Sequence, residues 1–417
     1  MSPLPLPAAN LVSRFFSPGV TSHELSSQWQ NPSDVFSVLL VLGGNVIQAA
    51  LAQLTGSKIT PIAFSFGWVA HGVSAVHSAV GENKLMPIAD CQCKVINGKT
   101  GYVRDNVSWI IGRIVRDFET WMDHHKPDGP IRRHLQSMIA RRWKMDKARA
   151  EERRKKGEVI PEPEEPTQTG LCVSVYQAEE ARPGYPGYDL LYFLGFATII
   201  LQFGIAAIPC ALYGDWGELL ITAAGTALCL ASGSLSQWAK EKWTARRNSR
   251  STFILSRGNG SQHAIVVLGS GKGLDLEDLA AVPTKVDIWA SRSMQISTMI
   301  LSILWICLLI SAAGLSQHTW YLLVIGGIGI IENIFVAGRW RRPEHFGIPL
   351  RFVEVLGEPK VMDSLFAVEE KYPHVGRAML ETFFPGRLSP EESRTWEDLE
   401  ETAERREEAQ KKAGDQQ

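Results

Sequence analysis

The residues of this chain that could do chemistry are polar side chains placed inside long apolar runs. Asn45 and His71 lie in two neighbouring runs near the start of the sequence, and Glu332 lies in another near its end. A neutral imidazole and a carboxylate in apolar surroundings suit proton transfer, for example in the cyclisation or isomerisation of a lipophilic small molecule. Asn45, His71 and Glu332 are therefore candidate catalytic residues.

Three further polar side chains occupy similar positions and are candidates for ligand binding: Gln48, Gln202 and Asn333. Asn45 lies roughly 15 Å and His71 roughly 14 Å in from the same predicted membrane surface, so the two could meet. The structural alternative is that Asn45, Gln48 and His71 only hold helices together, at about 1 kcal/mol per contact. For Glu332 the corresponding alternative is an ion pair with Arg339, seven residues further on.

The elements that hold these residues are six apolar runs, each about as long as a bilayer-spanning helix requires. They extend over Val35–Leu54, Thr60–Val80, Leu190 to about Leu212, Gly217 to about Gln237, Met294 to about Gly314 and Thr319 to about Gly338. Short turns join the runs in pairs. The sequence therefore predicts three transmembrane hairpins, at 34–81, 190–237 and 294–338.

The remaining segments are 1–33, 82–189, 238–293 and 339–417, and they contain all the basic clusters. The three tight turns within the hairpins contain only Lys58 as a basic residue. By the positive-inside rule, the long segments and both termini are expected in the cytosol. No cleavable signal peptide precedes the first run, so this run is expected to direct the chain to the endoplasmic reticulum or another endomembrane.

Short β-patterned stretches recur in the long segments, at 91–104, 171–176, 252–268 and 352–355. The turn Gly269–Gly273 follows one of them and contains Lys272, but it lacks the first glycine and the Ser/Thr of a P-loop. A plain turn is the favoured interpretation. The predicted fold class is a mainly α membrane protein, with six transmembrane helices as three hairpins and one composite cytosolic β-containing cap.

Residues 131–156 form a strongly basic predicted helix, with eleven Lys/Arg against three acidic residues, a net charge of +8. Ile131, Leu135, Met138, Ile139 and Met145 share its apolar face. This pattern favours a helix lying on an anionic membrane surface. Its candidate membrane-contacting residues are Arg132, Arg133, Arg141, Arg142, Lys144 and Lys147. Nucleic acid is not expected as a partner, because no base-reading module accompanies the helix.

No metal site, cofactor or structural disulfide is predicted. Cys91 and Cys93 could bind a metal together with His124 and His125, but their spacing is not that of a zinc site and no second cysteine pair follows. Three of the six cysteines fall in apolar runs and three in segments expected in the reducing cytosol.

Four stretches together resemble a group of multi-pass membrane proteins of filamentous fungi. They are Gly43–Gln48 (GGNVIQ), Phe66–Gly72 (FGWVAHG), Arg257–His263 (RGNGSQH) and Gly271–Leu279 (GKGLDLEDL). The resemblance covers residues from about 31 to 360. It implies a membrane protein sometimes encoded beside natural-product biosynthesis genes, but it brings no assigned activity and no functional residue.

Three functions are compatible with this sequence. The first is an endomembrane enzyme or accessory factor that acts on a lipophilic small molecule through Asn45, His71 and Glu332. The second is a scaffold that recruits cytosolic protein partners, which the sequence does not identify. The third is a transporter or channel, which would need polar groups across the whole membrane, whereas these lie in one half. Placement of the three candidate residues on unrelated surfaces would favour the scaffold.

Overall fold

The computed structural model describes residues 43–414, except 57–58, 82–83, 124–125, 127, 160, 282–287 and 316. The chain forms two compact units. The first, called the helical unit, comprises Met1–Leu85, Tyr188–Gln237 and Asp287–Gly338. The second, called the sheet unit, comprises Met86–Gly187, Trp238–Val286 and Arg339–Gln417.

The helical unit is built around the long helices α9 (Leu190–Tyr213), α10 (Gly217–Gly233), α13 (Ile288–Ala313) and α14 (Thr319–Gly338). Among the described residues, four helices are long and apolar enough to cross a membrane: Leu190–Tyr213, Gly217–Lys242, Arg292–Ala313 and Thr319–Gly338. Large apolar side chains on these helices face outward, including Ile200, Ile310 and Ile331, which are 72%, 67% and 69% exposed. This surface suits lipid and indicates an integral membrane protein.

The first predicted hairpin differs from expectation. Its helices are α4 (Gly44–Leu54) and α5 (Gly67–Gly81), while residues 59–66 have no regular secondary structure. The prediction of a continuous helix over Thr60–Val80 is therefore wrong. The 15 residues of α5 extend roughly 22 Å, less than the roughly 30 Å of a bilayer core. Residues 35–42 of the first run lie outside the described residues, as does the segment 1–33.

Residues 59–66 enter the helical unit at the end where α9 begins and α10 ends. The Tyr192 hydroxyl donates to the Ile59 carbonyl (3.2 Å), and the Thr60 hydroxyl donates to the Gly233 carbonyl (3.0 Å). The α9–α10 and α13–α14 turns meet at the opposite end, where His318 Nδ1 lies 3.5 Å from Asp215 Oδ2. The sequence placed the first turn on the same side as these two, and that prediction is wrong.

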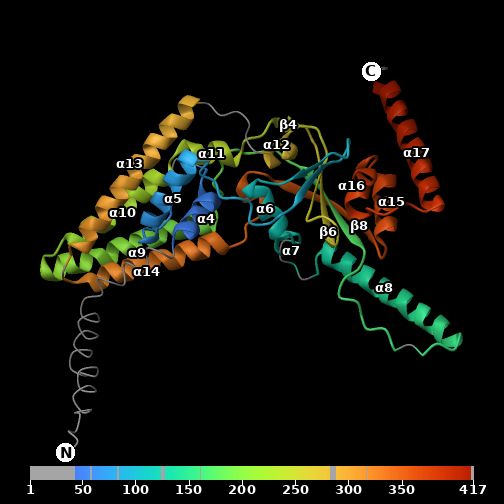
Figure 1. The fold of residues 1–417 in the computed structure, drawn as a ribbon, viewed down its shortest axis with the longest axis horizontal. Helices are drawn as coiled ribbons and strands as arrows, with labels where there is room; N and C mark the ends of the chain where they lie inside the picture. Colours follow the sequence, from blue (N-terminus) through green and yellow to red (C-terminus); the bar gives the residue numbers. More distant parts are fainter. Residues whose placement is uncertain are drawn as a thin grey trace, which may run out of the picture. The chain divides into compact units, whose positions relative to one another are not determined.

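The chain then reaches the interior of the helical unit and turns back towards the end at which it entered. Phe66 lies beside Gly326 of α14, and α5 begins at the next residue. Along α5, Gly72 lies against Ser302 of α13, and the Ala79 carbonyl accepts a hydrogen bond from Gln295 (3.2 Å), near the start of α13. Helix α5 therefore runs antiparallel to α13, back towards the end at which residues 59–66 entered. Residues 59–81 form a re-entrant segment, extended inward and helical outward. Figure 1 shows its helix α5 between α4 and α13.

Two features of this stretch explain why it is not helical at its start. Pro61 lacks an N–H and disfavours the helical conformation for the residue before it. The apolar content of residues 60–80 satisfies a hydropathy pattern equally well whether the backbone is helical or extended. An extended backbone survives in apolar surroundings only where other groups satisfy it, which the surrounding helices do here.

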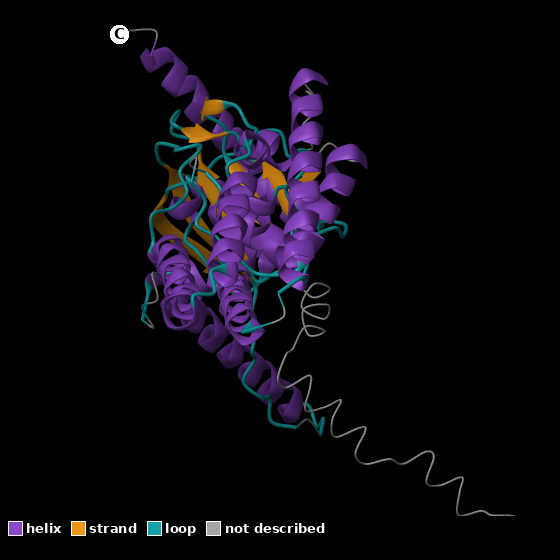
Figure 2. Cartoon of the chain, turned by 90° about the vertical axis from the view of Figure 1, so that its left-hand side faces the viewer, coloured by secondary structure: helices purple, strands orange, loops and turns teal. Residues whose placement is uncertain are grey.

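The sheet unit contains a six-stranded sheet of order β2-β1-β5-β6-β3-β8. Its strands are β1 (Lys94–Asn97), β2 (Val103–Asp105), β3 (Leu171–Ala178), β5 (Phe253–Ser256), β6 (His263–Leu268) and β8 (Leu350–Glu358). All neighbours pair antiparallel except β3 and β6, which are parallel. Strands from three separate parts of the sequence thus form one sheet, gathered in one region of Figure 2.

Helices cover both faces of this sheet. Val173 and Val175 of β3 face a core shared with Leu365 of α15 (Val361–Lys371) and Met379 of α16 (Val375–Phe383). On the other face, Tyr176 packs against Phe118 and Trp121 of α7 (Phe118–Trp121). Because side chains alternate along a strand, this two-sided cover buries nearly the whole of β3.

The other elements of the sheet unit are shorter or lie at its margins: α6 (Trp109–Arg116), α8 (Pro130–Lys155), α11 (Ser236–Lys242), β4 (Arg247–Ser249), β7 (Gly273–Leu274), α12 (Leu276–Ala280), η1 (Pro343–Phe346) and α17 (Pro390–Gly414). Asp275 caps α12 by accepting hydrogen bonds from the backbone N–H groups of Glu277 and Asp278. The glycine turn before it thus leads through β7 into a capped helix.

Candidate functional site

No strand among the described residues pairs with the re-entrant segment, and side chains of the surrounding helices satisfy its backbone. The Ala63 N–H donates to Glu332 Oε2 at 3.4 Å. The Ala63 carbonyl accepts from Asn333 Nδ2 at 3.2 Å and from Trp68 Nε1 at 3.0 Å. Asn333 Nδ2 also donates to the Ser65 hydroxyl at 3.2 Å. Two adjacent residues of α14 therefore hold both polar groups of one peptide residue.

Gln202 of α9 makes the corresponding contact one residue further on. Its Nε2 donates to the Phe64 carbonyl at 2.7 Å and to the Ile325 carbonyl of α14 at 2.9 Å. The side chain is fully buried. Gln202 therefore links the re-entrant segment to both α9 and α14, and it explains why an amide is placed deep in an otherwise apolar helix.

Glycines let the helices approach the segment closely. A Cβ atom at Gly195 of α9 would lie 1.8 Å from the Pro61 carbonyl oxygen, and one at Gly329 of α14 would lie 1.9 Å from the Phe64 carbonyl oxygen. Such distances leave no room for any side chain. Close approach at small residues is typical of packed membrane helices, and here the partner is an extended backbone.

An aromatic cluster packs beside the segment. The Trp305 ring of α13 stacks on Phe64 (centroids 6.2 Å apart) and on Trp68 (5.4 Å). His71 meets Trp68 edge-on at 5.6 Å and is buried. Trp68 also donates to the Ala63 carbonyl, so it links His71 to the residue whose N–H donates to Glu332.

The structure brings some of the predicted site residues together and separates others. Gln202, Glu332 and Asn333 converge on residues 63–65, although they are distant in sequence. Asn45 of α4 is exposed, and Gln48 of the same helix donates to the Leu85 carbonyl at 2.8 Å. The expected pairing of Asn45 with His71 thus joins an exposed residue to a buried one, which does not fit a shared buried site.

Three side-chain oxygen atoms beside residues 63–65 can each still accept a hydrogen bond. Glu332 Oε1, Asn333 Oδ1 and Gln202 Oε1 are buried and have no hydrogen-bond partner within the described part of the chain. Glu332 also forms no ion pair with any described residue. A carboxylate without a cation is stable in such surroundings when it carries a proton. The site can therefore hold a proton and accept hydrogen bonds from a ligand.

Sequence reasoning did not identify Gly195, Gly329, Trp68 and Trp305 as parts of this site. Gly326 and Gly329 are three residues apart on α14, a small-residue spacing that indicates close packing. Pro61 in an apolar run was the signal for an unwound segment. The two tryptophans carry no local signal, because an aromatic residue in an apolar helix usually faces lipid or core.

In the sheet unit, the basic helix α8 uses part of its apolar face internally. Ile131 and Met138 are fully buried, and Met138 lies against Gly357 of β8. Arg141 Nη1 donates to both carboxylate oxygens of Glu358 of β8 (2.7 and 3.0 Å), and Nη2 donates to the Gly357 carbonyl (3.3 Å). The expectation that the whole apolar face lies on a membrane is therefore wrong for the first half of α8, because β8 already covers it.

The remaining predicted membrane-contacting residues of α8 have varied surroundings. Arg132 donates to the Glu119 carbonyl (2.9 Å), Arg142 pairs with Asp146 (3.0 Å), and Lys147 lies over the Trp143 ring (3.8 Å). Arg133 and Lys144 are exposed, as are residues 151–159. A basic surface for anionic lipid would therefore lie on the outer side and far end of α8. His124 and His125 lie outside the described residues.

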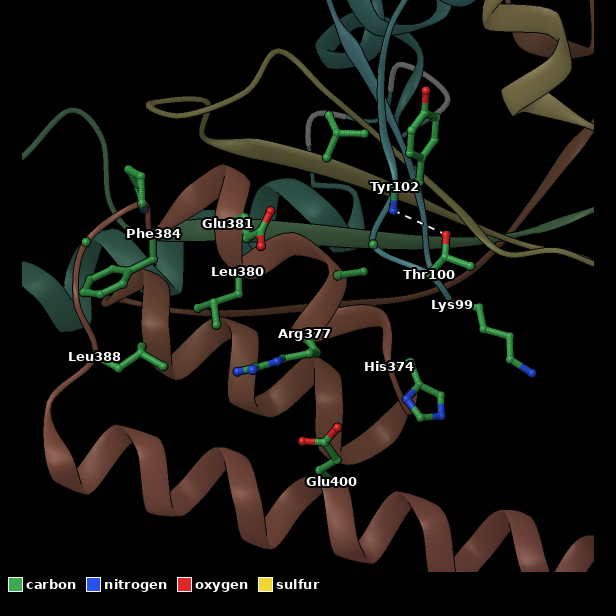
Figure 3. Close-up of a pocket in the computed structure, with 15 residues that line it drawn as sticks. Lys99, Thr100, Tyr102, His374, Arg377, Leu380, Glu381, Phe384, Leu388 and Glu400 are labelled. Atoms are coloured by element: carbon green, nitrogen blue, oxygen red, sulfur yellow. Dashed lines mark hydrogen bonds between the residues drawn. The ribbon is translucent and has the colours of Figure 1, made fainter.

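A cleft of about 1060 Å³ lies between the β1–β2 turn and α16. Figure 3 shows its polar side chains, among them Lys99, His374, Arg377, Glu381 and Glu400, which project from different elements. Its lining residues include both cations and carboxylates. The cleft is open to solvent and offers a docking surface rather than an enclosed site.

Two buried cysteines of the sheet unit are unsuited to catalysis. Burial raises the pKa of the Cys93 thiol and of the Cys172 thiol to about 12 in each case. The nucleophilic and metal-binding form of cysteine is the thiolate, which neither residue populates near neutral pH. Covalent chemistry at these two positions is therefore disfavoured.

Comparison of the chain with protein-family models, with curated proteins and with solved structures found no match. The functional argument therefore rests on the geometry of the chain itself.

Proposed function

We propose that this protein is an integral endomembrane protein that acts on a lipophilic small molecule at the re-entrant segment, as an enzyme or an accessory factor. The observation that carries the proposal is the buried Glu332 carboxyl beside an extended backbone. One of its oxygens accepts from Ala63, and the other has no hydrogen-bond partner among the residues that the structure describes. A neutral amide would satisfy the Ala63 N–H equally well. A carboxyl adds a transferable proton, which is the property that acid/base catalysis uses.

The location of the site determines the class of ligand. Residues 60–66 are buried among apolar and aromatic side chains, and the outer surfaces of the helices suit lipid. A molecule that reaches this site partitions into the bilayer first, so it is lipophilic and carries at least one hydrogen-bond donor for the acceptor oxygens. Glu332 is the proposed proton donor and acceptor, and His71 is the proposed second group on the same part of the segment.

Transport is a second candidate, favoured by one specific observation. Extended backbone held between helices by side chains is typical of secondary transporters, where broken helices form the substrate site near the membrane centre. In this case Glu332 would couple a proton to movement of the molecule. Uptake into proteoliposomes driven by a pH gradient, absent in Glu332→Gln, would support transport over catalysis.

The proposed membrane is the endoplasmic reticulum or another endomembrane, with the basic segments of the sheet unit in the cytosol. The re-entrant path then places Ile59 on the cytosolic side and the turn that contains Gln317 on the lumenal side. Single cysteines at these two positions, in a background without the native cysteines, should react with an impermeant thiol reagent from opposite sides. Labelling of both from one side would contradict the re-entrant topology.

Deletion of the gene in the source organism, followed by metabolite and lipid profiling, tests the proposal. We expect a lipophilic compound to accumulate or disappear, and we expect wild-type protein but not Glu332→Gln to restore the profile at matched abundance. Glu344→Gln, at an exposed carboxylate of the sheet unit, is the matched control and should restore it. An unchanged profile on deletion, or full restoration by Glu332→Gln, would refute an acid/base role.

Anionic lipid is the proposed partner of the outer side of α8. The exposed Arg133, Lys144, Arg154, Lys155 and Lys156 carry this proposal, because surface attraction contributes about 1 kcal/mol per basic residue near the headgroups. A peptide of residues 131–156 should bind phosphatidylserine vesicles and dissociate as salt rises. Equal binding to neutral vesicles would exclude the electrostatic contribution.

A further inference from the structure

Three side chains with metal-binding chemistry meet where the two turns of the helical unit come together. Asp215 lies in the α9–α10 turn, Glu218 in the first turn of α10, and His318 immediately before α14. One ligand atom from each residue lies within 4.8 Å of the other two. His318 Nδ1 is 3.5 Å from Asp215 Oδ2. Two helix pairs that are about 100 residues apart in sequence thus place three potential ligands around one point.

Glu218 indicates that a ligand belongs there. Its side chain is fully buried, and neither carboxylate oxygen has a hydrogen-bond partner among the residues that the structure describes. A buried carboxylate without a partner is destabilising, and a cation at the shared point would remove that penalty. Asp215 adds a second negative charge beside it, which increases the need for a cation.

Local contacts fix the other two residues. Asp215 Oδ1 accepts a hydrogen bond from the Gly217 N–H at 3.0 Å, which leaves Oδ2 directed to His318. The His318 ring stacks on the Tyr213 ring, with centroids 4.3 Å apart and planes 15° from parallel. Asp215 and His318 are therefore both held in place by contacts with the end of α9 and the α9–α10 turn. Small side-chain rotations would bring one ligand atom each from Asp215, Glu218 and His318 around one ion.

We propose that Asp215, Glu218 and His318 bind a divalent transition-metal ion of the Zn²⁺ or Mn²⁺ class. One imidazole nitrogen with two carboxylates suits these ions, Zn²⁺ as a borderline ion and Mn²⁺ as a harder one, whereas Ca²⁺ takes six to eight oxygen ligands and soft ions such as Cu⁺ prefer sulfur. Ligand distances of about 2.0–2.2 Å require the three groups to close in slightly. The ion joins the α9–α10 turn to the α13–α14 turn and keeps at least one position for water. This site does not depend on the proposed function.

The test uses full-length protein purified in detergent, stripped with a chelator and titrated separately with Zn²⁺ and Mn²⁺. We expect one ion per chain by calorimetry and by elemental analysis after desalting. Glu218→Gln and His318→Ala should each weaken binding by at least about tenfold, the loss that removal of even an outer-sphere partner causes. The controls His77→Ala, at an exposed imidazole of α5, and Glu344→Gln should bind as wild type does.

A second measurement needs no variant and therefore does not depend on folding of the mutants. Mass spectrometry of wild-type protein treated with diethyl pyrocarbonate should show His318 modified in the stripped state and protected once Zn²⁺ is added, while His77 reacts equally in both states. The proposal is overturned if His318 reacts equally with and without either ion. It is also overturned if the triple variant Asp215→Asn, Glu218→Gln, His318→Ala retains as much metal as wild type.

Discussion

Two stretches of this chain are extended and buried, but they are held in different ways. In β3, the backbone pairs with β6 on one side and β8 on the other, over residues 171–178. In the re-entrant segment, residues 60–66 are equally buried, and no strand in the described part of the chain pairs with them. Their polar groups are satisfied instead by single side chains such as Gln202, Glu332 and Asn333.

This difference determines which residues stabilise each stretch. Backbone pairing in a sheet repeats at every residue and tolerates changes of side chain that preserve packing. Satisfaction by side chains is specific, because each backbone group depends on one or two particular side chains: the Phe64 carbonyl on Gln202, and the Ala63 carbonyl on Asn333 and Trp68. A buried carbonyl that loses its donor costs about 1–3 kcal/mol. Polar residues in the membrane-spanning helices should therefore be far less tolerant of substitution than buried polar residues of β3.

The largest effect is expected at the glycine contacts. Gly329→Ala places a methyl group 1.9 Å from the Phe64 carbonyl oxygen, so α14 and the segment must separate. We expect a loss of about 3 kcal/mol or more, with low abundance of folded protein. The matched control is Gly327→Ala, where a Cβ would meet nothing within 4 Å and helix propensity improves. Fluorescence size-exclusion profiles of the two variants measure this, and equal profiles would contradict the close packing.

An intermediate effect is expected for the amide that holds the segment. Gln202→Leu removes the donor of the Phe64 carbonyl and should cost about 1–3 kcal/mol. The comparison variant is Ser174→Ala in β3, whose buried hydroxyl has no hydrogen-bond partner among the described residues. That change should alter stability by less than about 0.5 kcal/mol. Thermal denaturation in detergent checks both values, and a larger loss for Ser174→Ala would reverse the comparison.

The smallest effect concerns protonation within the sheet. Burial lowers the pKa of His263, which pairs in register with Cys172 of β3. The unfolded chain therefore binds a proton more readily, and folded-state stability should fall as pH drops below the ordinary imidazole pKa of about 6.5. Above that pH no dependence from this residue is expected. His263→Gln should flatten the slope of the unfolding free energy against pH between about pH 6.5 and 5. An unchanged slope would show that the pH dependence in this range comes from other groups.

The sequence by itself determined the elements whose signals are local. The ends of α9 and α14 follow from apolar runs bounded by turn residues, and β3 follows from its β-branched pattern. A capping box opens α17, with the Ser389 N–H donating to Glu392 Oε2 at 2.7 Å and the Glu392 N–H donating to Ser389 Oγ at 3.2 Å. These features depend on residues within a few positions of one another.

The candidate site was only partly predictable for the same reason. Gln202, Glu332 and Asn333 were identified because a polar side chain in an apolar run is conspicuous in any sequence. The sequence did not predict that these side chains are partners of one extended backbone, since Ala63 and Glu332 are 269 positions apart. Asn45 and His71 share a predicted depth, yet depth along a helix does not determine which face is buried.

Tertiary structure alone decided that the run after Thr60 is extended and re-entrant and that strands from three segments form one sheet. Both outcomes depend on satisfying backbone polar groups with partners from distant parts of the chain. Hydropathy measures how much a stretch prefers an apolar environment, and it is the same for a helix as for an extended segment. The partners that satisfy the backbone decide between the two, and only the folded chain brings them together.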